Sequence, residues 1–407
     1  MRSVEEALKT VLDSTKVLGT ERIAIQDAHG RVLAEDVSSG LFHPPWDNSA
    51  MDGFAVRWDD IKNASKESGV QLRIVGDVRA GIMPDKPVKK GEAIRIMTGA
   101  PVPDGADSVV RVEDTKTEGD SVNIFCAGKI GENVRHKGEN IKKGDTVLSK
   151  GSVLGAAHIG VMAMVGKPVV SVFRRPKVMV LATGDELADL DEEITENKIP
   201  NSNGYTIAAQ VIESGGIPHL LGIARDNKES LREKIGEGLE GDMLLVSGGV
   251  SVGMYDFVKD ILKEYGIDMK FWTVGIRPGH PIAFGLVGNK PIFGLPGNPV
   301  STMVTFEVFA RPALLKMSGH TSFSRPIVEA VCEKELRTRP GRTNYVRAVT
   351  RYKDGKYHAR STGDQGSGIL ISMSQANSFI ILPPDKEKVL QGEVVKVQLF
   401  AGHVDYS

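Results

Sequence analysis

The sequence has few cysteines, almost no net charge and no long apolar run, and each shortage excludes a class of protein. Cys126 and Cys332 are the only cysteines among 407 residues, too few for a cysteine-based metal site and consistent with a reducing compartment. The 51 Lys and Arg residues balance 52 Asp and Glu residues, so we expect no nucleic-acid partner. No run of about 18 apolar residues occurs, so we expect no membrane span. The N-terminus lacks the apolar core of a signal peptide, and we expect a cytoplasmic protein.

Two common phosphate-binding signatures are also missing. The chain contains no Gly-x-x-x-x-Gly-Lys-Ser/Thr sequence, and no Gly-x-Gly-x-x-Gly follows the first strand of its α/β segment. These absences argue against a P-loop NTPase and against a dinucleotide-dependent dehydrogenase.

The patterning of apolar residues predicts a multi-domain chain of the α/β plus β class. Short alternating runs separated by Gly and Pro fill residues 54–147 and predict an all-β domain. From residue 177 strands alternate with helices, as in a parallel α/β domain, and after residue 319 the pattern is β again. We therefore expect four domains: a mostly helical N-terminal linker domain (1–45 and 145–175), an inserted β domain (46–144), a central α/β domain (176–319) and a C-terminal β domain (320–407).

Three local patterns add detail to this organisation. Ser3 and Glu6 form a capping-box pattern, and residues 1–40 are expected to be helical apart from a short strand at 22–25. A single long helix is expected over residues 301–316. The charged run 189–196 is expected to be a solvated loop rather than a site.

The most informative segment is a glycine-rich turn between a strand and a helix. Ser247, Gly248 and Gly249 follow the apolar run 242–246 and precede a helix predicted from residue 255. Such a turn leaves backbone N–H groups exposed at the helix N-terminus, where they suit an anion. Asp256 would lie in the first turn of that helix and could hold a cation against the same anion. A plain packing turn is the alternative.

Acidic residues follow three of the predicted strands. Ligands of open parallel sheets bind beyond the carboxyl ends of the strands, and Glu186, Asp226 and Asp256 all fall there. Mg²⁺ is typically held by one or two carboxylates together with substrate phosphate oxygens, so these acids are candidate metal ligands. The alternative for Asp185 and Asp226 is helix N-capping, but three acids converging beside a Gly-Gly turn favour a site.

Two further clusters are less decisive. Residues 276–281 and 294–301 are Pro- and Gly-rich loops, and within the first Arg277 offers a fork of donors to an oxyanion. Taken alone, both loops are better explained as tight turns. The β region also contributes Asp52 and Thr98, and its basic stretch 135–143 could receive a phosphorylated ligand or remain solvated.

Six segments, in this order, are similar to the motifs of one family. They are residues 45–56, 96–103, 183–187, 247–253, 294–301 and 363–367. Together they resemble the molybdopterin molybdotransferase family (MoeA-type), which includes the C-terminal domain of gephyrin, over nearly the whole chain. The resemblance implies an elongated homodimer of four-domain subunits with a molybdopterin-binding-like central domain and a barrel-like C-terminal domain. Its active site would lie between the α/β domain of one subunit and the inserted β domain of the other.

The resemblance also implies a reaction. Molybdate, or tungstate, would be inserted into the dithiolene of adenylylated molybdopterin, with Mg²⁺-dependent cleavage of the adenylate and release of AMP. A molybdopterin adenylyltransferase would act upstream. The catalytic residues would be Asp52, Thr98, Glu186, Asp226 and Asp256, of which the last three would bind Mg²⁺ and the first two would come from the partner subunit. The residues expected to bind the substrates are Thr183, Gly184, Asp185, Asn203, Ser247, Gly248, Gly249, Ser251, Arg277, His280, Pro296, Ser301, Arg347 and Ser367. Within this set, Arg277, His280, Ser301, Arg347 and Ser367 would gather the oxyanion.

The chain departs from the family pattern at four positions. Thr273, Arg277 and His280 stand where the family often has Lys, and Asn140 stands where it often has an acid. Arg277 keeps the positive charge, Thr273 loses it, and His280 is charged only when protonated. We therefore expect oxyanion capture to weaken as His280 loses its proton, and the choice between molybdate and tungstate stays open. The alternative function is that of a catalytically weak paralogue or a scaffold, which would bind molybdopterin or protein partners without turnover.

Overall fold

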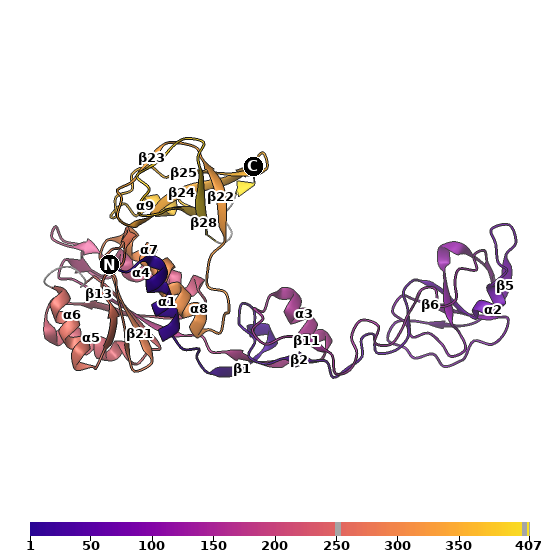
Figure 1. Ribbon diagram of the computed structural model, residues 1–407. Helices are drawn as coiled ribbons and strands as arrows, with labels where there is room; N and C mark the ends of the chain where they lie inside the picture. Colours follow the sequence, from indigo (N-terminus) through magenta and orange to yellow (C-terminus); the bar gives the residue numbers. More distant parts are fainter. Residues whose placement is uncertain (249–253, 401–404, 407) are drawn as a thin grey trace. The chain divides into compact units, whose positions relative to one another are not determined.

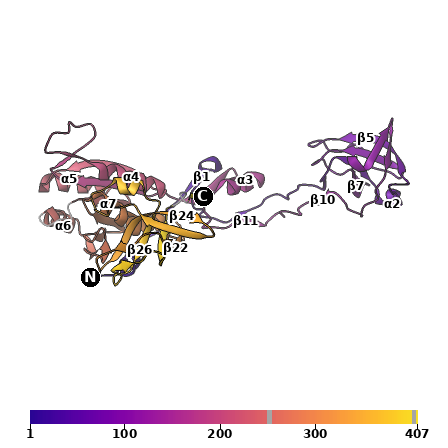
Figure 2. The ribbon, with the colours of Figure 1, turned by 90° about the horizontal axis from the view of Figure 1, so that it is seen from above.

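The computed structural model describes residues 1–248, 254–400 and 405–406, and the side chains of all of these except 254–257 and 405–406. The chain forms two compact units, which are drawn in two views in Figures 1 and 2. Unit 1 comprises Met1–Arg22, Gly30–Ala34 and Ser171–Ser407, and unit 2 comprises Ile23–His29 and Glu35–Val170.

Unit 1 is built on a six-stranded sheet with the strand order β16-β13-β17-β21-β20-β18. Its strands are β13 (Lys177–Thr183), β16 (Ile217–Ala224), β17 (Met243–Ser247), β18 (Asp268–Phe271), β20 (Ala283–Val287) and β21 (Lys290–Leu295). The first four strands of the order are parallel, as predicted, whereas β20 runs antiparallel to both of its neighbours. The carboxyl ends of β13, β16, β17 and β21 therefore meet at one edge of the sheet.

Helices cover both faces of this sheet (Figures 1 and 2). The helices of unit 1 are α1 (Val4–Ser14), α4 (Ser202–Glu213), α5 (Lys228–Gly238), α6 (Met254–Glu264), α7 (Pro299–Thr305), α8 (Arg311–Met317) and α9 (Ile371–Ser374). Along β13, Val178 and Val180 pack in the cluster that contains α4 and α7, whereas Met179 and Leu181 pack in the cluster that contains α5 and α6. Successive side chains of a strand point to opposite faces, so a strand covered on both faces must be apolar throughout.

Two helices differ in extent from the sequence expectation. The capping box is confirmed, because Ser3 Oγ accepts a hydrogen bond from the Glu6 amide over 3.1 Å. However, α1 ends at Ser14 and residues 20–24 form strand β1 (Thr20–Ala24), so the expectation that residues 1–40 are mostly helical is wrong. The helix expected over 301–316 is divided into α7 and α8 by a π-helical segment, Phe306–Ala310, in which buried Glu307 pairs with Arg325 over 2.8 Å.

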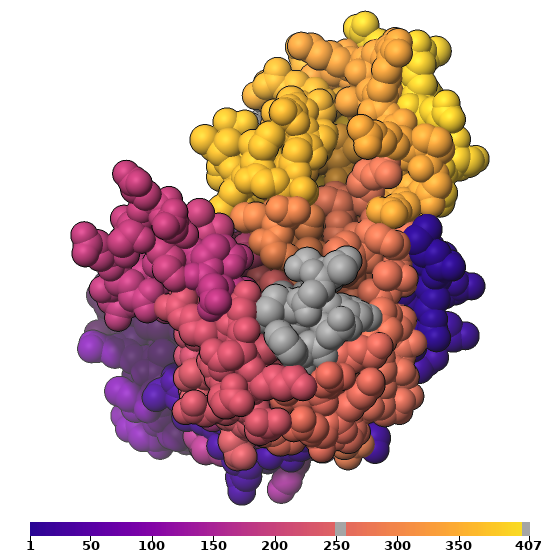
Figure 3. Space-filling model, turned by 90° about the vertical axis from the view of Figure 1, so that its left-hand side faces the viewer, coloured from indigo at the N-terminus to yellow at the C-terminus, as the bar shows by residue number. Residues whose placement is uncertain are grey.

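The C-terminal domain is a closed barrel, which confirms the barrel-like fold predicted for it. Its strands are β22 (Ile327–Cys332), β24 (Thr343–Lys353), β25 (Lys356–Ser361), β26 (Ser378–Leu382) and β28 (Val394–Leu399). They follow the cycle β24-β25-β22-β28-β26, and β26 closes the cycle by pairing with β24. The short strand β19 (Ile276–Arg277) also pairs with β24, so the α/β domain contributes a strand to the barrel sheet. Figure 3 shows the barrel, in orange to yellow, against the α/β domain, in magenta through red to orange.

Unit 2 contains a second six-stranded sheet with the order β7-β4-β6-β5-β9-β8. Its strands are β4 (Gly53–Val56), β5 (Val70–Val78), β6 (Glu92–Ile96), β7 (Ser108–Arg111), β8 (Thr115–Glu118) and β9 (Ser121–Ile124). Apolar side chains on the two faces of this sheet form separate clusters around Phe54 and Ile94, as alternation along the strands requires. The predicted inserted β domain is therefore present.

The remaining elements are short. They are α2 (Trp58–Ile61), α3 (Ala156–Met164), 3₁₀ turns at Ile25–Asp27 and Val112–Asp114, and strands β2 (Val37–Ser38), β3 (Asn48–Ser49), β10 (Val134–Arg135), β11 (Thr146–Leu148), β12 (Val169–Phe173), β14 (Leu187–Ala188), β15 (Ile199–Pro200), β23 (Leu336–Arg337), β27 (Lys388–Val389) and β29 (Asp405–Tyr406). Within the described part of the chain, the helices are all too short or too polar to pass through a lipid bilayer.

Candidate functional site

Two of the predicted acidic residues are joined at the carboxyl edge of the unit 1 sheet. Asp185 follows β13 and Asp226 follows β16, and the Asp226 amide donates a hydrogen bond to Asp185 Oδ1 over 3.1 Å. Gly184, between β13 and Asp185, has a φ of +146°, and a Cβ there would lie 2.5 Å from a carboxylate oxygen of Glu186. Only glycine leaves room for the Glu186 carboxylate to fold back over the strand end.

The Asp226 carboxyl is poorly compensated. Its Oδ1 is buried and has no hydrogen-bond partner among the described residues. Burial raises the pKa of this carboxyl above its ordinary value, and the negative charges of Asp185 and Glu186 raise it further. A divalent cation would bond to the unpartnered Oδ1, and its positive charge would offset both the burial of the carboxylate and the repulsion from Asp185 and Glu186.

The described side chains do not complete a metal site by themselves. No group of three or more His, Cys, Asp and Glu side chains placed to hold a metal ion is found among those that the structure describes. Asp256 lies in the first turn of α6, as predicted, but its side chain is outside the described set, and Gly249 and Ser251 lie outside the described residues altogether. Mg²⁺ takes one or two carboxylates and completes its shell with phosphate oxygens and water, so Asp226 and Glu186 fit such an ion.

The helix-capping alternative for the two aspartates is wrong. Asn201 caps α4, since its side chain accepts a hydrogen bond from the Gly204 amide, and Asn227 caps α5 through the Ser230 amide. Asparagine serves as well as aspartate at this position. Asp185 and Asp226 are therefore free for another role at the sheet edge.

The glycine turn after β17 lies directly against the end of β13. Gly248 has a φ of +85°, and a Cβ there would lie 2.7 Å from the Thr183 carbonyl oxygen and 2.9 Å from Thr183 Oγ1. Asn203, in the first turn of α4, donates from Nδ2 to Ser247 Oγ over 2.9 Å and to the Gly297 carbonyl oxygen over 2.7 Å. Thr183 Oγ1 and Asn203 Oδ1 are buried and lack partners among the described residues, so two polar atoms remain for a ligand.

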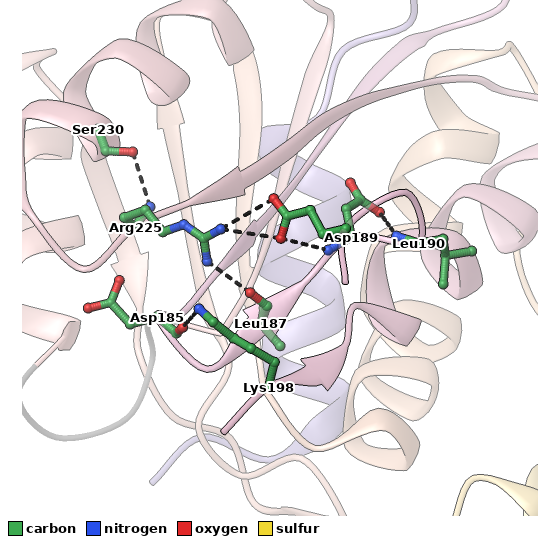
Figure 4. A network of polar contacts seen from close by, with 8 residues as sticks. Asp185, Leu187, Asp189, Leu190, Lys198, Arg225 and Ser230 are labelled. Carbon is green, nitrogen blue, oxygen red and sulfur yellow. Dashed lines mark hydrogen bonds and ion pairs between the residues drawn. The ribbon is translucent and has the colours of Figure 1, made fainter. Parts of the chain in front are cut away.

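The segment after Glu186 is tethered rather than freely solvated (Figure 4). Arg225 donates from Nη1 to the Leu187 carbonyl oxygen over 2.8 Å, and its Nη2 lies 3.4 Å from Glu192 Oε1. Lys198 donates to the Asp185 carbonyl oxygen, and Tyr205 donates its hydroxyl to Asp189 over 2.7 Å. The expected exposed loop at 189–196 is present, and two of its acidic residues, Asp189 and Glu192, are held by these tertiary contacts.

A basic cavity lies where the 277–280 loop meets the barrel. Its volume is about 400 Å³, and Arg277, Arg347, Gly363 and Gln365 are among its lining residues. Arg347 is fully buried and donates from Nη2 to the Asp364 and Gly366 carbonyl oxygens, each over 3.1 Å. Its Nε and Nη1 have no hydrogen-bond partner among the described residues. Burial lowers the pKa of Arg347, although Asp364 opposes that shift.

Helix α7 packs against the 277–280 loop and against the loop that carries Ser367. The Val300 amide, in its first turn, donates to the Ser367 carbonyl oxygen over 3.1 Å, and the adjacent Ser301 is buried. A Cβ on Gly279 would lie 2.3 Å from Thr305 Cγ2, so the 277–280 loop packs tightly on the same helix. The Pro296 carbonyl oxygen accepts a hydrogen bond from the Thr302 hydroxyl of this helix.

His280 is placed differently from the arginines. Its Nδ1 lies 2.9 Å from the Val274 carbonyl oxygen, and a hydrogen bond between them requires Nδ1 to carry the proton. His280 is not among the residues that line the basic cavity, and Thr273 is exposed. The dependence of oxyanion capture on His280 therefore stays a prediction.

Unit 2 contains the predicted Asp52 and Thr98 as a bonded pair. Asp52 Oδ1 accepts hydrogen bonds from the Thr98 amide over 2.7 Å and from its hydroxyl over 2.8 Å. These two bonds, and then the charge of Arg95, lower the pKa of Asp52 below its ordinary value. The pair is thus held with Asp52 as an oriented carboxylate.

Comparisons with known proteins decide the family. Residues 2–166 match the MoeA N-terminal region (domain I and II), residues 179–316 match the probable molybdopterin binding domain, and residues 329–400 match the MoeA C-terminal region (domain IV). The chain is 38% identical over 384 residues to the molybdopterin molybdenumtransferase of Nostoc sp., which covers 93% of this chain and 88% of that protein. The chain belongs to the molybdopterin molybdenumtransferase family.

Two further members support this assignment. The molybdopterin molybdenumtransferase of Bacillus subtilis is 34% identical over 401 residues, covering 97% of this chain and 93% of that protein. The solved structure of the molybdopterin biosynthesis MoeA protein from Pyrococcus horikoshii matches with a TM-score of 0.85 and 33% identity, covering 98% of this chain and 99% of that one. The family resemblance inferred from the six motifs is confirmed.

Sequence reasoning missed several residues that organise the site in this family member. Arg225 and Lys198 hold the segment after β13. Gln365 Oε1 accepts a hydrogen bond from the Arg347 amide over 2.9 Å. Arg225 directly precedes Asp226 at a strand end, which is a signal that could have drawn attention to it. The contacts of Lys198 carry no local signal, because they join positions 13 residues apart across an irregular loop.

Proposed function

We propose that the protein inserts molybdate into adenylylated molybdopterin with Mg²⁺-dependent release of AMP, as a step of molybdenum cofactor biosynthesis. Family membership supports a transferase, since the curated relatives carry the name molybdopterin molybdenumtransferase. The two subsites of unit 1 supply what the reaction needs, namely acids for a cation beside a phosphoanhydride and a basic cavity for an oxyanion. Nothing in the described residues calls for a protein nucleophile.

The observation that carries this proposal is the buried, incompletely bonded guanidinium of Arg347. A buried charge without a partner is strongly unfavourable, and Nε and Nη1 of Arg347 lack one among the described residues. A tetrahedral dianion in the cavity would accept from these atoms and from Arg277 on the neighbouring strand β19. Ser301 and Ser367 would add hydroxyl donors from the start of α7 and from the barrel loop beside it.

Glu186, Asp226 and Asp256 would hold the magnesium ion. When bound, Mg²⁺ would neutralise the phosphate oxygens of the adenylylated substrate. The buried, unpartnered Oδ1 of Asp226 supports this assignment from the described side chains. The Asp185 carboxylate would accept the hydrogen bond from the Asp226 amide and so orient Asp226, rather than bind the ion itself.

The pterin and nucleotide would lie along the carboxyl edge of the sheet. Thr183 Oγ1 and Asn203 Oδ1 would provide polar partners beside the close approach of Gly248 to β13. Gly249 and Ser251, which lie outside the described residues, would bind phosphate as the family resemblance implies. Gly184, Ser247 and Pro296 would shape this edge. The protein's contribution would be positioning and charge neutralisation.

Asp52 and Thr98 would enter the site from a second copy of the chain in a homodimer. The two hydrogen bonds from Thr98 fix the orientation of the Asp52 carboxylate, which supports a role for it in the active site of the other subunit. A cytoplasmic location and an upstream molybdopterin adenylyltransferase complete the proposal. Tungstate is the competing oxyanion, and no observation favours a scaffold without turnover.

Oxyanion binding to cavity variants tests this function. Titration calorimetry with molybdate should detect binding to the wild-type chain and its loss in Arg347→Met, with a weaker signal in Arg277→Met. Arg351→Met is the matched control, because Arg351 lies on the same strand, β24, and is exposed. Equal molybdate affinity in the wild type and both cavity variants would contradict the proposal.

A further inference from the structure

Two arginines in the loop beside the basic cavity have no ion-pair partner among the described residues. Arg339 and Arg342 lie in the loop between β23 and β24, and neither forms an ion pair within the described part of the chain. Arg337, next to them, differs because its Nε lies 2.9 Å from Glu335 Oε1, and Glu335 also pairs with Lys388 over 3.0 Å. The positive charge of Arg337 is therefore paired with a carboxylate, whereas those of Arg339 and Arg342 are not paired within the described part of the chain.

The backbone of this loop is fixed by hydrogen bonds from several sides. Asn344 donates from Nδ2 to the Arg342 carbonyl oxygen over 2.8 Å, and Arg277 donates from Nη1 to the Arg339 carbonyl oxygen over 2.8 Å. The Gly341 amide donates to the Pro384 carbonyl oxygen over 2.7 Å. These bonds fix the backbone from which the two arginine side chains extend.

Both charges act on the cavity itself. Arg339 lines it together with Arg277 and Arg347. The pKa of Arg277 is lowered first by burial and then by the positive charges of Arg342 and Arg339. Such crowding of like charges is unfavourable in the empty cavity and is relieved when an anion enters.

We propose that Arg339 and Arg342 form an outer ring of positive charge that captures a tetrahedral oxyanion dianion and delivers it to Arg277 and Arg347. This inference rests on the proposed function, because it requires the cavity to receive the oxyanion. The ring acts on capture and not on the later chemistry, since Arg339 is exposed and Arg342 is half-buried while Arg347 is fully buried. Low-dielectric walls of one charge sign raise the local concentration and the association rate of an opposite charge.

The test uses the full chain and the variant Arg339→Gln/Arg342→Gln. Molybdate affinity, measured by titration calorimetry at low salt, should fall about three- to tenfold, and the loss should shrink at high salt because these charges are screened. In steady-state turnover KM for molybdate should rise while kcat stays the same. The variant Arg339→Lys/Arg342→Lys should restore affinity, because it keeps the charge.

Arg337→Gln is the matched control. It removes an arginine from the same cavity wall, but one that Glu335 already neutralises, so its molybdate affinity should change less than about twofold. Wild-type affinity and wild-type salt dependence in the double glutamine variant would overturn the inference. An equal loss in Arg337→Gln, or no rescue by lysine, would overturn it as well.

Failure of the inference and failure of the proposed function give different results. If Arg347→Met abolishes molybdate binding while the double glutamine variant binds as the wild type does, only the outer ring is wrong. If the wild-type chain binds no molybdate, or if Arg347→Met binds it normally, the cavity is not the oxyanion site and both ideas are wrong. Circular dichroism and thermal unfolding confirm that each variant is folded before binding is measured.

Discussion

The Asp226 amide donates a hydrogen bond to the Asp185 carboxylate over 3.1 Å, and this bond joins the ends of two neighbouring parallel strands. The Asp226 carboxyl lies near the negative charges of Asp185 and Glu186, and its buried Oδ1 has no partner among the described residues. A protein does not retain such an arrangement for stability alone, since burial without a partner is unfavourable. The arrangement suits a cation that arrives with the substrate.

Asp226→Asn should weaken divalent-cation binding. The amide keeps the size of the side chain and removes the charge that an ion requires, so affinity for Mn²⁺ as a magnesium substitute should fall at least about tenfold. Electron paramagnetic resonance of free and bound Mn²⁺ measures this directly. Asp189→Asn is the control, because Asp189 bonds to Tyr205 in the neighbouring segment and should leave affinity unchanged. Equal losses in the two variants would point to a general charge effect.

Arg225→Met should loosen the segment that carries Asp185 and Glu186. The variant loses the hydrogen bond to the Leu187 carbonyl oxygen and the ion pair with Glu192, while the Arg225 amide can still donate to Ser230. Hydrogen exchange should become faster over residues 185–199, and Mn²⁺ affinity should fall several-fold, by about 1 kcal/mol. Arg232→Met on α5 removes an exposed pair with Glu264 and should change neither quantity. Unchanged exchange in Arg225→Met would show that the tether does not order the segment.

Gly248→Ala should destabilise unit 1 more than a comparable glycine substitution. Its φ of +85° disfavours alanine, and the new Cβ would also lie 2.7 Å from the Thr183 carbonyl oxygen. We expect a loss of roughly 2–3 kcal/mol, seen as a lower thermal unfolding midpoint. Gly215→Ala is matched in φ, at +83°, but meets no atom within 4 Å, so it isolates the backbone contribution. Equal midpoints for the two variants would contradict the close approach of the turn to β13.

The Asp242 carboxylate should contribute stability that is lost in acid. It accepts hydrogen bonds from Arg174 Nη1 over 2.7 Å and from the Lys177 amide over 2.8 Å. Burial alone would raise the pKa of Asp242, but these bonds outweigh burial and lower it below the ordinary 3.8. The folded state thus binds this proton less readily than the unfolded state, so the stabilisation is present above pH 3.8 and disappears as the pH falls through the lower folded value.

Acid unfolding of Asp242→Asn measures this contribution. The variant should be less stable than the wild type near neutral pH, by about 1 kcal/mol after allowance for partial exposure, and the two should converge in strong acid. Asp268→Asn is the control, since Asp268 is exposed and pairs with nearby Lys270. A constant difference between Asp242→Asn and the wild type at all pH values would contradict the assignment.

The sequence allowed the sheet edge to be predicted because its signals are local. Continuous apolar runs marked β13 and β17, and the residues that follow them, Thr183 to Glu186 and Ser247 to Gly248, had to fall at the carboxyl edge once the strands were parallel. The apolar pattern predicted only a β domain at the C-terminus. Its barrel-like form was predicted from the family resemblance. The antiparallel strand β20 gave no separate signal, since a buried run reads the same in either direction.

Residues that act through tertiary contacts could not be predicted in this way. Arg225, Lys198 and Arg339 work through backbone carbonyl groups or charges that only the folded loops bring near them. The capping alternative for Asp226 was also undecidable locally, because the adjacent Asn227 is an equally good helix N-cap. Helix 301–316 was predicted as continuous because a π-helical segment has no reliable sequence pattern.

Turnover is the measurement that tests the account most directly. Purified protein, adenylylated molybdopterin and Mg²⁺ are combined with and without molybdate or tungstate, and AMP release and cofactor formation are followed. The account predicts AMP release that depends on the oxyanion and is lost in Arg347→Met, even though that variant still binds the adenylylated pterin. Tight binding of the adenylylated pterin by the wild-type protein without AMP release under either oxyanion would contradict it.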